Sequence, residues 1–173
     1  MGIVLKYKTF LLALLGLIWV HGSLKADPLS NDCQEALRAV QNACGSWRAK
    51  GISDPFDFFD TQKRVKVNDR LLRCINQYNL DRAALVNALR HGDPESRMYL
   101  EKMKEDLECV RKLSKPRKGY HGGDFNRLKK LLDLLDRLME YANRDKMVFV
   151  FPEGDNCPCD VSLEPRYKGI VVE

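Results

Sequence analysis

The stretch DFNRLKKLLDLLDRLMEYANR, residues 124–144, carries the clearest pattern in the chain. Its apolar residues recur at heptad spacing, and further leucines widen the apolar face that this spacing produces on a helix. A face this wide needs several neighbouring elements to cover it, as in the core of a helical bundle. We therefore predict a mainly α protein built around this helix. The apolar positions are Phe125, Leu128, Leu131, Leu132, Leu134, Leu135, Leu138, Met139 and Ala142.

Three further helical segments are predicted before this one. The first covers residues 28–50 and ends where glycine and proline break the pattern. The second covers residues 65–78 and, after a pause at 79–81, is followed by a short helix over 82–90. The third covers residues 94–113, with proline at its first position. Together with residues 124–144, these segments predict a bundle of about four helices.

The character of the sequence changes after the last helix. Met147-Val148-Phe149-Val150-Phe151 is typical of a short strand, and Gly169-Ile170-Val171-Val172 is typical of another. We expect the two to pair as a small ribbon or to form an irregular tail. The predicted fold is therefore a mainly α, disulfide-stapled bundle over residues 27–145, with a cysteine-containing C-terminal tail over residues 146–173 packed on it.

The first residues have the pattern of a secretory signal. Lys6 and Lys8 precede an apolar run over residues 10–20. This run is too short to span a bilayer, which needs roughly 20 apolar residues. A charged start, a short apolar run and small residues near a cleavage site are typical of a signal peptide. We predict that residues 1–26 are removed after Ala26, or alternatively after Gly22, and that the mature protein is secreted.

The mature chain is predicted to be nearly neutral. The full chain holds 29 Lys and Arg against 24 Asp and Glu, a net charge of +5. Lys6, Lys8 and Lys25 belong to the predicted signal, so the mature chain carries a net charge of +2. A balance this even gives no indication of nucleic-acid binding. The mature sequence has no apolar run of membrane length, so we expect no stable membrane insertion after cleavage.

Six cysteines in a secreted chain predict three disulfides. A bond between Cys157 and Cys159 would close a strained ring, so each is expected to reach back to a cysteine in the helical region. Cys33 and Cys44 lie about three turns apart on one helix, too far to bond to each other. The sequence leaves the remaining pairing open. The predicted disulfide cysteines are Cys33, Cys44, Cys74, Cys109, Cys157 and Cys159.

The sequence offers little for catalysis. The mature chain has two histidines, His91 and His121, and both are expected at the surface. A hydrolase triad or a zinc site would have to use one of them or do without histidine. The Cys157-Pro158-Cys159 motif lacks the spacing and context of thioredoxin-like redox motifs, which favours a structural role. We therefore predict a protein that is not an enzyme, with no catalytic residues, no metal and no cofactor.

Two loops are candidates for contact with a partner. Phe56, Phe58 and Phe59 lie in a predicted loop, where they either pack over the core or form an exposed anchor. The second loop covers residues 114–123 and is basic. It is open to three interpretations: a solvated loop, a proteolytic site, or a patch for sulfated glycans or an acidic receptor face. We take Phe56, Phe58, Phe59, Lys115, Arg117 and Lys118 as the candidate partner-binding residues.

The predicted helices, signal and disulfides are broadly similar in architecture to a four-helix cytokine or hormone over residues 30–145. No motif assigns the chain to a family. We predict a secreted, non-enzymatic protein that binds an extracellular protein or receptor, as a cytokine-like ligand, a venom or salivary effector, or a reproductive or matrix protein. The alternative is an extracellular carrier of a small apolar ligand in a helical cavity. The sequence leaves the oligomeric state open.

Overall fold

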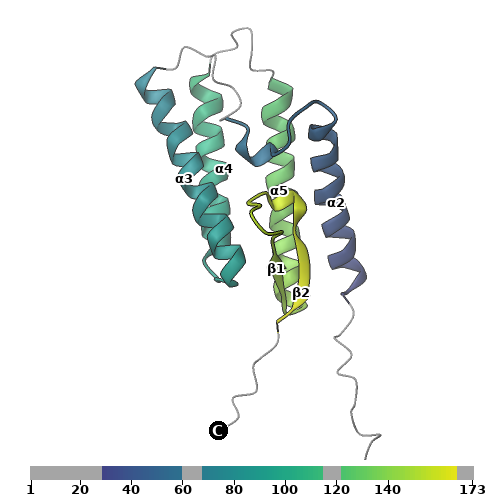
Figure 1. The fold of residues 1–173 in the computed structure, drawn as a ribbon. Helices are drawn as coiled ribbons and strands as arrows, with labels where there is room; N and C mark the ends of the chain where they lie inside the picture. The colour runs from purple at the N-terminus through teal and green to yellow at the C-terminus, as the bar shows by residue number, and fades with distance from the viewer. Residues whose placement is uncertain (1–28, 60–67, 115–121, 167–173) are drawn as a thin grey trace, which may run out of the picture.

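The computed structural model describes residues 29–59, 68–114 and 122–166. The predicted signal peptide, the basic residues Lys115, Arg117 and Lys118, and the predicted strand at 169–172 lie outside the described residues. The described chain is mainly helical, with a short two-stranded antiparallel sheet near its C-terminal end and two disulfides (Figure 1). The predicted fold class is confirmed.

Helix α2 (Asn31–Arg48) begins at a side-chain cap. The hydroxyl of Ser30 accepts a hydrogen bond from the backbone N–H of Cys33 at 3.2 Å. Such a cap satisfies one of the backbone donors that a helix start leaves unpaired. The buried face of α2 consists of Cys33, Ala36, Val40, Cys44 and Trp47, and its spacing of three and four positions is that of an amphipathic helix.

Helix α3 (Asp69–His91) is continuous, so the predicted break at 79–81 is wrong. Asp81 does not cap a new helix, because its side chain is buried, with 6% of the residue exposed. Burial of Tyr78 and Leu85 on the same side carries the helix through this point. Gly92 ends α3 with a left-handed φ of 63°, a conformation that glycine adopts without strain.

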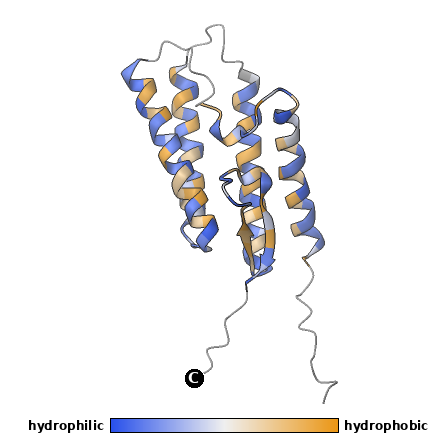
Figure 2. Cartoon of the chain, in the orientation of Figure 1, coloured by the Kyte–Doolittle hydropathy of each residue, from blue (hydrophilic) through white to orange (hydrophobic). Residues whose placement is uncertain are grey.

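Helix α4 (Ser96–Leu113) returns alongside α3, and helix α5 (Gly122–Arg144) packs against both α4 and α2. The wide apolar face of α5 is buried as predicted, from Phe125 to Ala142. The helix begins at Gly122, so Asp124 lies in its first turn and is not the cap that would start it. Apolar and hydrophilic residues alternate along each helix, as expected for amphipathic helices packed on one side (Figure 2).

The space between α2 and α3 is filled by non-helical chain. The short 3-10 helix η1 (Pro55–Asp57) and the C-terminal sheet lie across this side of the bundle (Figure 1). Strand β1 (Met147–Val150) matches the predicted strand and contacts both α3 and α5. It pairs with strand β2 (Ser162–Pro165), which the sequence analysis missed. A second 3-10 helix, η2 (Pro158–Asp160), packs against α2.

The three phenylalanines of the η1 loop belong to the core. Phe56, Phe58 and Phe59 are 0%, 1% and 5% exposed, so the prediction that they form a partner-binding surface is wrong. Their rings pack edge to face with aromatic residues of the helices: the centroid distance is 5.5 Å from Phe58 to Trp47 and 4.9 Å from Phe59 to Tyr78. Rings in this geometry add to the stabilisation gained from burial.

An ion pair holds the same loop to α3. The guanidinium of Arg82 contacts the carboxylate of Asp54 and lies 3.7 Å from that of Asp57. The side chain of Asp54 also accepts the backbone N–H of Phe56 at 2.9 Å, which caps η1. The loop therefore enters the core with its polar ends tied to α3 and its rings inside.

We expect Phe58→Ala to lower the free energy of unfolding by about 3–5 kcal/mol, because it removes a fully buried ring and leaves a cavity. Guanidinium denaturation followed by circular dichroism measures this change. Met98→Ala is the matched control, since Met98 is 43% exposed and its truncation should change stability by about 0.5 kcal/mol or less. Equal stability of the two variants would place Phe58 at the surface.

Candidate binding cleft

Four of the six cysteines form the disulfides Cys44–Cys159 and Cys74–Cys109. The first joins the tail to α2, as expected for one of the two tail cysteines, and the second joins α3 to α4. The prediction is wrong for Cys33 and Cys157, which are buried thiols. The tail meets α2 at Cys44, near the C-terminal end of that helix, whereas Cys33 lies about three turns away at its start.

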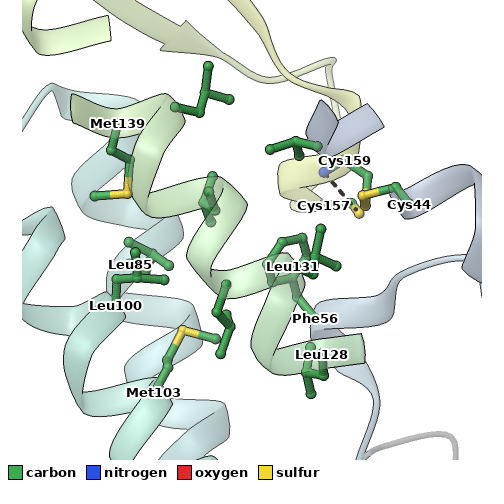
Figure 3. Packing of buried hydrophobic residues seen from close by; sticks show 14 of the residues in the cluster. Cys44, Phe56, Leu85, Leu100, Met103, Leu128, Leu131, Met139, Cys157 and Cys159 are labelled. Carbon is green, nitrogen blue, oxygen red and sulfur yellow. Dashed lines mark hydrogen bonds between the residues drawn. A yellow bond between two sulfur atoms is a disulfide. The ribbon is translucent and has the colours of Figure 1, made fainter. Parts of the chain in front are cut away.

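Both free thiols lie in surroundings that disfavour the thiolate. Burial raises the pKa of Cys33 to about 11 and that of Cys157 to about 12. Cys157 lies beside the Cys44–Cys159 disulfide, and its sulfur accepts the backbone N–H of Cys159 at 3.4 Å (Figure 3). A thiol that stays protonated at neutral pH is a poor nucleophile and a poor metal ligand. Their setting therefore favours packing over chemistry for these two residues.

The clearest concave site lies at one end of the bundle. A cleft of about 320 Å³ opens where the turn between α3 and α4 meets the end of α5 and strand β1. Its apolar lining comes from all of these elements and includes small and flexible side chains. Its buried apolar residues are Ala88, Leu89, Met139, Ala142, Met147 and Phe149.

The sequence builds this cleft from two tight turns. Gly92 ends α3, and the carboxylate of Asp93 accepts the backbone N–H of Glu95 at 2.8 Å, which fixes the corner before α4. At the other side, Lys146 has a positive φ of 56° and turns the chain from α5 into β1. Ala88 and Ala142 line the space between the two turns, and their short side chains fill little of it.

Arg166 forms part of the rim through a close contact with Gly92. Its guanidinium donates a hydrogen bond to the carbonyl oxygen of Gly92 at 3.2 Å, and its backbone N–H donates to Lys146 at 2.7 Å. A Cβ at position 92 would lie only 2.8 Å from the guanidinium. Glycine is therefore favoured there for its left-handed φ, and a side chain at position 92 would displace the guanidinium of Arg166.

The rim carries charges of both signs. The guanidinium of Arg97 is held 3.2 Å from the carboxylate of Asp136. Arg166 and Glu140, in contrast, form no ion pair with the residues that the structure describes. An apolar floor with charged side chains at its edge can hold an apolar group and hydrogen-bond to what surrounds it.

Of the predicted histidines, the structure describes His91, which does not line the cleft. The Nδ1 of His91 is 2.8 Å from the carbonyl oxygen of Asn87, on the exposed surface as expected. His121, Lys115, Arg117 and Lys118 lie outside the described residues. Within residues 29–59, 68–114 and 122–166, no cluster of His, Cys, Asp and Glu is arranged to hold a metal ion, and no helix is long and apolar enough to cross a membrane.

One buried polar contact lies apart from the cleft, between α3 and α4. Asp81 accepts a hydrogen bond from the amide of Gln77 at 3.0 Å and interacts with the carboxyl group of Asp106 on α4. Burial, together with the neighbouring Asp81, raises the pKa of Asp106 to about 7. A carboxyl group that is partly buried beside a second one stays protonated to higher pH than an exposed carboxyl group does.

The raised pKa of Asp106 makes the folded state bind a proton more tightly than the unfolded chain does. Its contribution to stability is present at acidic pH and is lost as the pH rises from about 4, the ordinary range of Asp, through about 7. We expect the urea midpoint of the wild type to fall between pH 5 and pH 8. Asp106→Asn should flatten this dependence and raise the midpoint at pH 8, because the amide does not ionise.

Glu35→Gln is the control for this pH series, because Glu35 is an exposed carboxylate on α2. The urea midpoint of Glu35→Gln should change with pH as the midpoint of the wild type does. The raised pKa of Asp106 would be contradicted if the urea midpoint of the wild type rose from pH 5 to pH 8. It would also be contradicted if the midpoint of Asp106→Asn depended on pH as that of the wild type does.

No family model, curated protein or solved structure matches this chain. The geometry and chemistry of the molecule itself therefore carry the functional proposal.

Proposed function

We propose that this protein is secreted and acts by binding another extracellular macromolecule, without catalysis, through the cleft at the α3–α4 turn. The observation that carries this proposal is the cleft's combination of a buried apolar floor with charged side chains of both signs at its rim. The N-terminal signal pattern supports secretion. Two disulfides are also compatible with an oxidising compartment.

The cleft is suited to a side chain presented by a protein partner. Its volume of about 320 Å³ is at the lower end of the range for ligand pockets, so it holds a compact apolar group. Met139 and Met147 both line the cleft, and methionine adapts its shape to different apolar groups. At the rim, Arg166 donates hydrogen bonds and Glu140 accepts them, as an approaching peptide backbone or polar side chain requires.

The alternative, a carrier of a small apolar ligand, requires space for that ligand. The side chains where α3, α4 and α5 meet are fully buried and pack closely, as Figure 3 shows for Leu85, Leu100 and Met103. Interiors packed in this way leave little room for a ligand. A carrier function would therefore use the same open cleft at the end of the bundle.

A blocked cleft tests the proposal. Asn143 is exposed at the rim, so Asn143→Trp should fill the opening without disturbing the core. Asn126→Trp is the matched control, because Asn126 is exposed on the same helix and does not line the cleft. We expect binding of the wild type to an immobilised panel of extracellular domains, with affinity lowered at least tenfold by Asn143→Trp and unchanged by Asn126→Trp.

Two further readings of the same samples separate the alternatives. Intact mass of protein recovered from the culture medium should show a chain that begins after Ala26 or after Gly22. Partner binding that Asn143→Trp leaves unchanged would show that the cleft is not the binding site. Binding of a fluorescent fatty acid to the wild type that Asn143→Trp abolishes, with no protein partner bound, would favour the carrier.

A further inference from the structure

One end of the bundle carries an excess of positive charge. The end of α2, the start of α3, the end of α4 and the start of α5 lie together there, opposite the end that holds the cleft (Figure 1). These four helix ends hold nine Lys and Arg against three Asp and Glu, a net charge of +6, over residues 44–51, 68–75, 107–114 and 123–130. The matching stretches at the cleft end hold five against seven, a net charge of −2, over residues 29–36, 86–93, 95–102 and 139–146.

The Cys74–Cys109 disulfide brings two of these basic residues together. It holds α3 beside α4, with the two Cα atoms 6.0 Å apart. Arg70 precedes Cys74 by four positions and Lys112 follows Cys109 by three, so each lies one turn away from the disulfide on the same side of its helix. Because the two helices are antiparallel, both turns lead toward the basic end (Figure 1). Arg70 and Lys112 therefore flank one seam, and both are exposed.

A shared carboxylate extends this group to α5, which packs on the other side of α4. Glu108 lies 2.7 Å from the guanidinium of Arg111 and 3.8 Å from the ammonium group of Lys129. One negative charge thus stands between two positive ones, and Arg111 is next to Lys112 in the chain. Basic side chains from three neighbouring helices therefore form one row. We call this row the basic band; it consists of Arg70, Lys112, Arg111 and Lys129, all exposed.

The charge of the basic band is only partly neutralised. Arg70 and Lys112 form no ion pair with the residues that the structure describes, and Arg111 and Lys129 share one carboxylate. Arg70 also lies in the first turn of α3, where the helix dipole disfavours a positive charge and Asp69 is the acidic residue. Like charges gathered in this way repel each other and cost stability, which favours a role in binding. Residues 60–67 and 115–121 lie outside the described residues and form no part of the band.

We propose that the basic band binds a sulfated polysaccharide of the extracellular space. Such a chain carries sulfate groups along its length, so a row of basic side chains across three helices meets several of them at once. Guanidinium groups hold tetrahedral oxyanions through paired hydrogen bonds, and lysines attract them as point charges. The backbone at the start of α3 also favours an anion beside Arg70. This inference rests on the proposed secretion, and it adds a second binding surface to the cleft.

The composition of the basic end favours a polysaccharide over an acidic membrane surface. A protein that lies on a membrane combines basic residues with apolar side chains that enter the lipid. Of the described residues at the basic end, Leu72 is the one large apolar residue with high exposure, at 44%. A sulfated polysaccharide needs no apolar contact, which matches a band made of charged side chains.

Binding of a heparin oligosaccharide of defined length to the purified, disulfide-bonded full chain tests the proposal. We expect the triple variant Arg70→Gln, Lys112→Gln and Lys129→Gln to raise the dissociation constant about tenfold or more, because it removes three charges that face the sulfates. Arg111 is kept, so its ion pair with Glu108 remains. Raising the salt from ~0.05 M to ~0.3 M should weaken binding of the wild type, since exposed charges are screened.

The matched control removes the same net charge outside the band. Arg38, Lys102 and Arg137 are exposed, and changing all three to Gln should alter the affinity for heparin less than about twofold. Absence of binding at low salt, an equal loss in the two triple variants, or equal competition by desulfated heparin overturns the proposal. Tighter binding to phosphatidylserine vesicles than to heparin would assign the band to a membrane surface and also overturn it.

The cleft variant separates this inference from the proposed cleft function. Asn143→Trp changes the opposite end of the bundle, so it should leave heparin binding unchanged even where it blocks a protein partner. A loss of heparin binding in Asn143→Trp would place the polysaccharide in the cleft and overturn the proposal.

Discussion

The packing of non-helical chain between α2 and α3 is the contact on which the rest of this structure depends. Helix α2 packs against α5, and α3 packs against α4, so the bundle would stay open on one side without further elements. The rings of the η1 loop and the C-terminal sheet close it (Figure 1). The wide apolar face of α5 is buried because these segments cover the part that the helices leave exposed.

The Cys44–Cys159 disulfide secures this closure, because it joins the tail to α2 across 115 residues of sequence. A link across a loop of this length removes about 4–5 kcal/mol of unfolded-state entropy in the chain-entropy account. Arg48 and Asp160 pair beside it. The second disulfide joins α3 to α4. Each half of the bundle is thus tied covalently, and the cleft is presented on a fixed frame.

The helical architecture could be predicted from the sequence because it rests on local periodicity. The apolar face from Phe125 to Ala142, the end of α3 at Gly92 and strand β1 all follow from residues close in the chain. Strand β2 was missed because Ser162-Leu163-Glu164-Pro165 holds one strongly apolar residue and ends in proline. The cleft could not be predicted, because Gly92 and Arg166 meet only after the tail has folded back.

Differential alkylation tests the central claim most directly. The disulfide-bonded protein is denatured without reductant and alkylated with one isotopic form of a reagent, then reduced and alkylated with the other. Fragmentation spectra assign the label at each cysteine, including Cys157 and Cys159. This account predicts the first label on Cys33 and Cys157 and the second label on Cys44, Cys74, Cys109 and Cys159. The second label on all six cysteines, or the first label on Cys159, would contradict it.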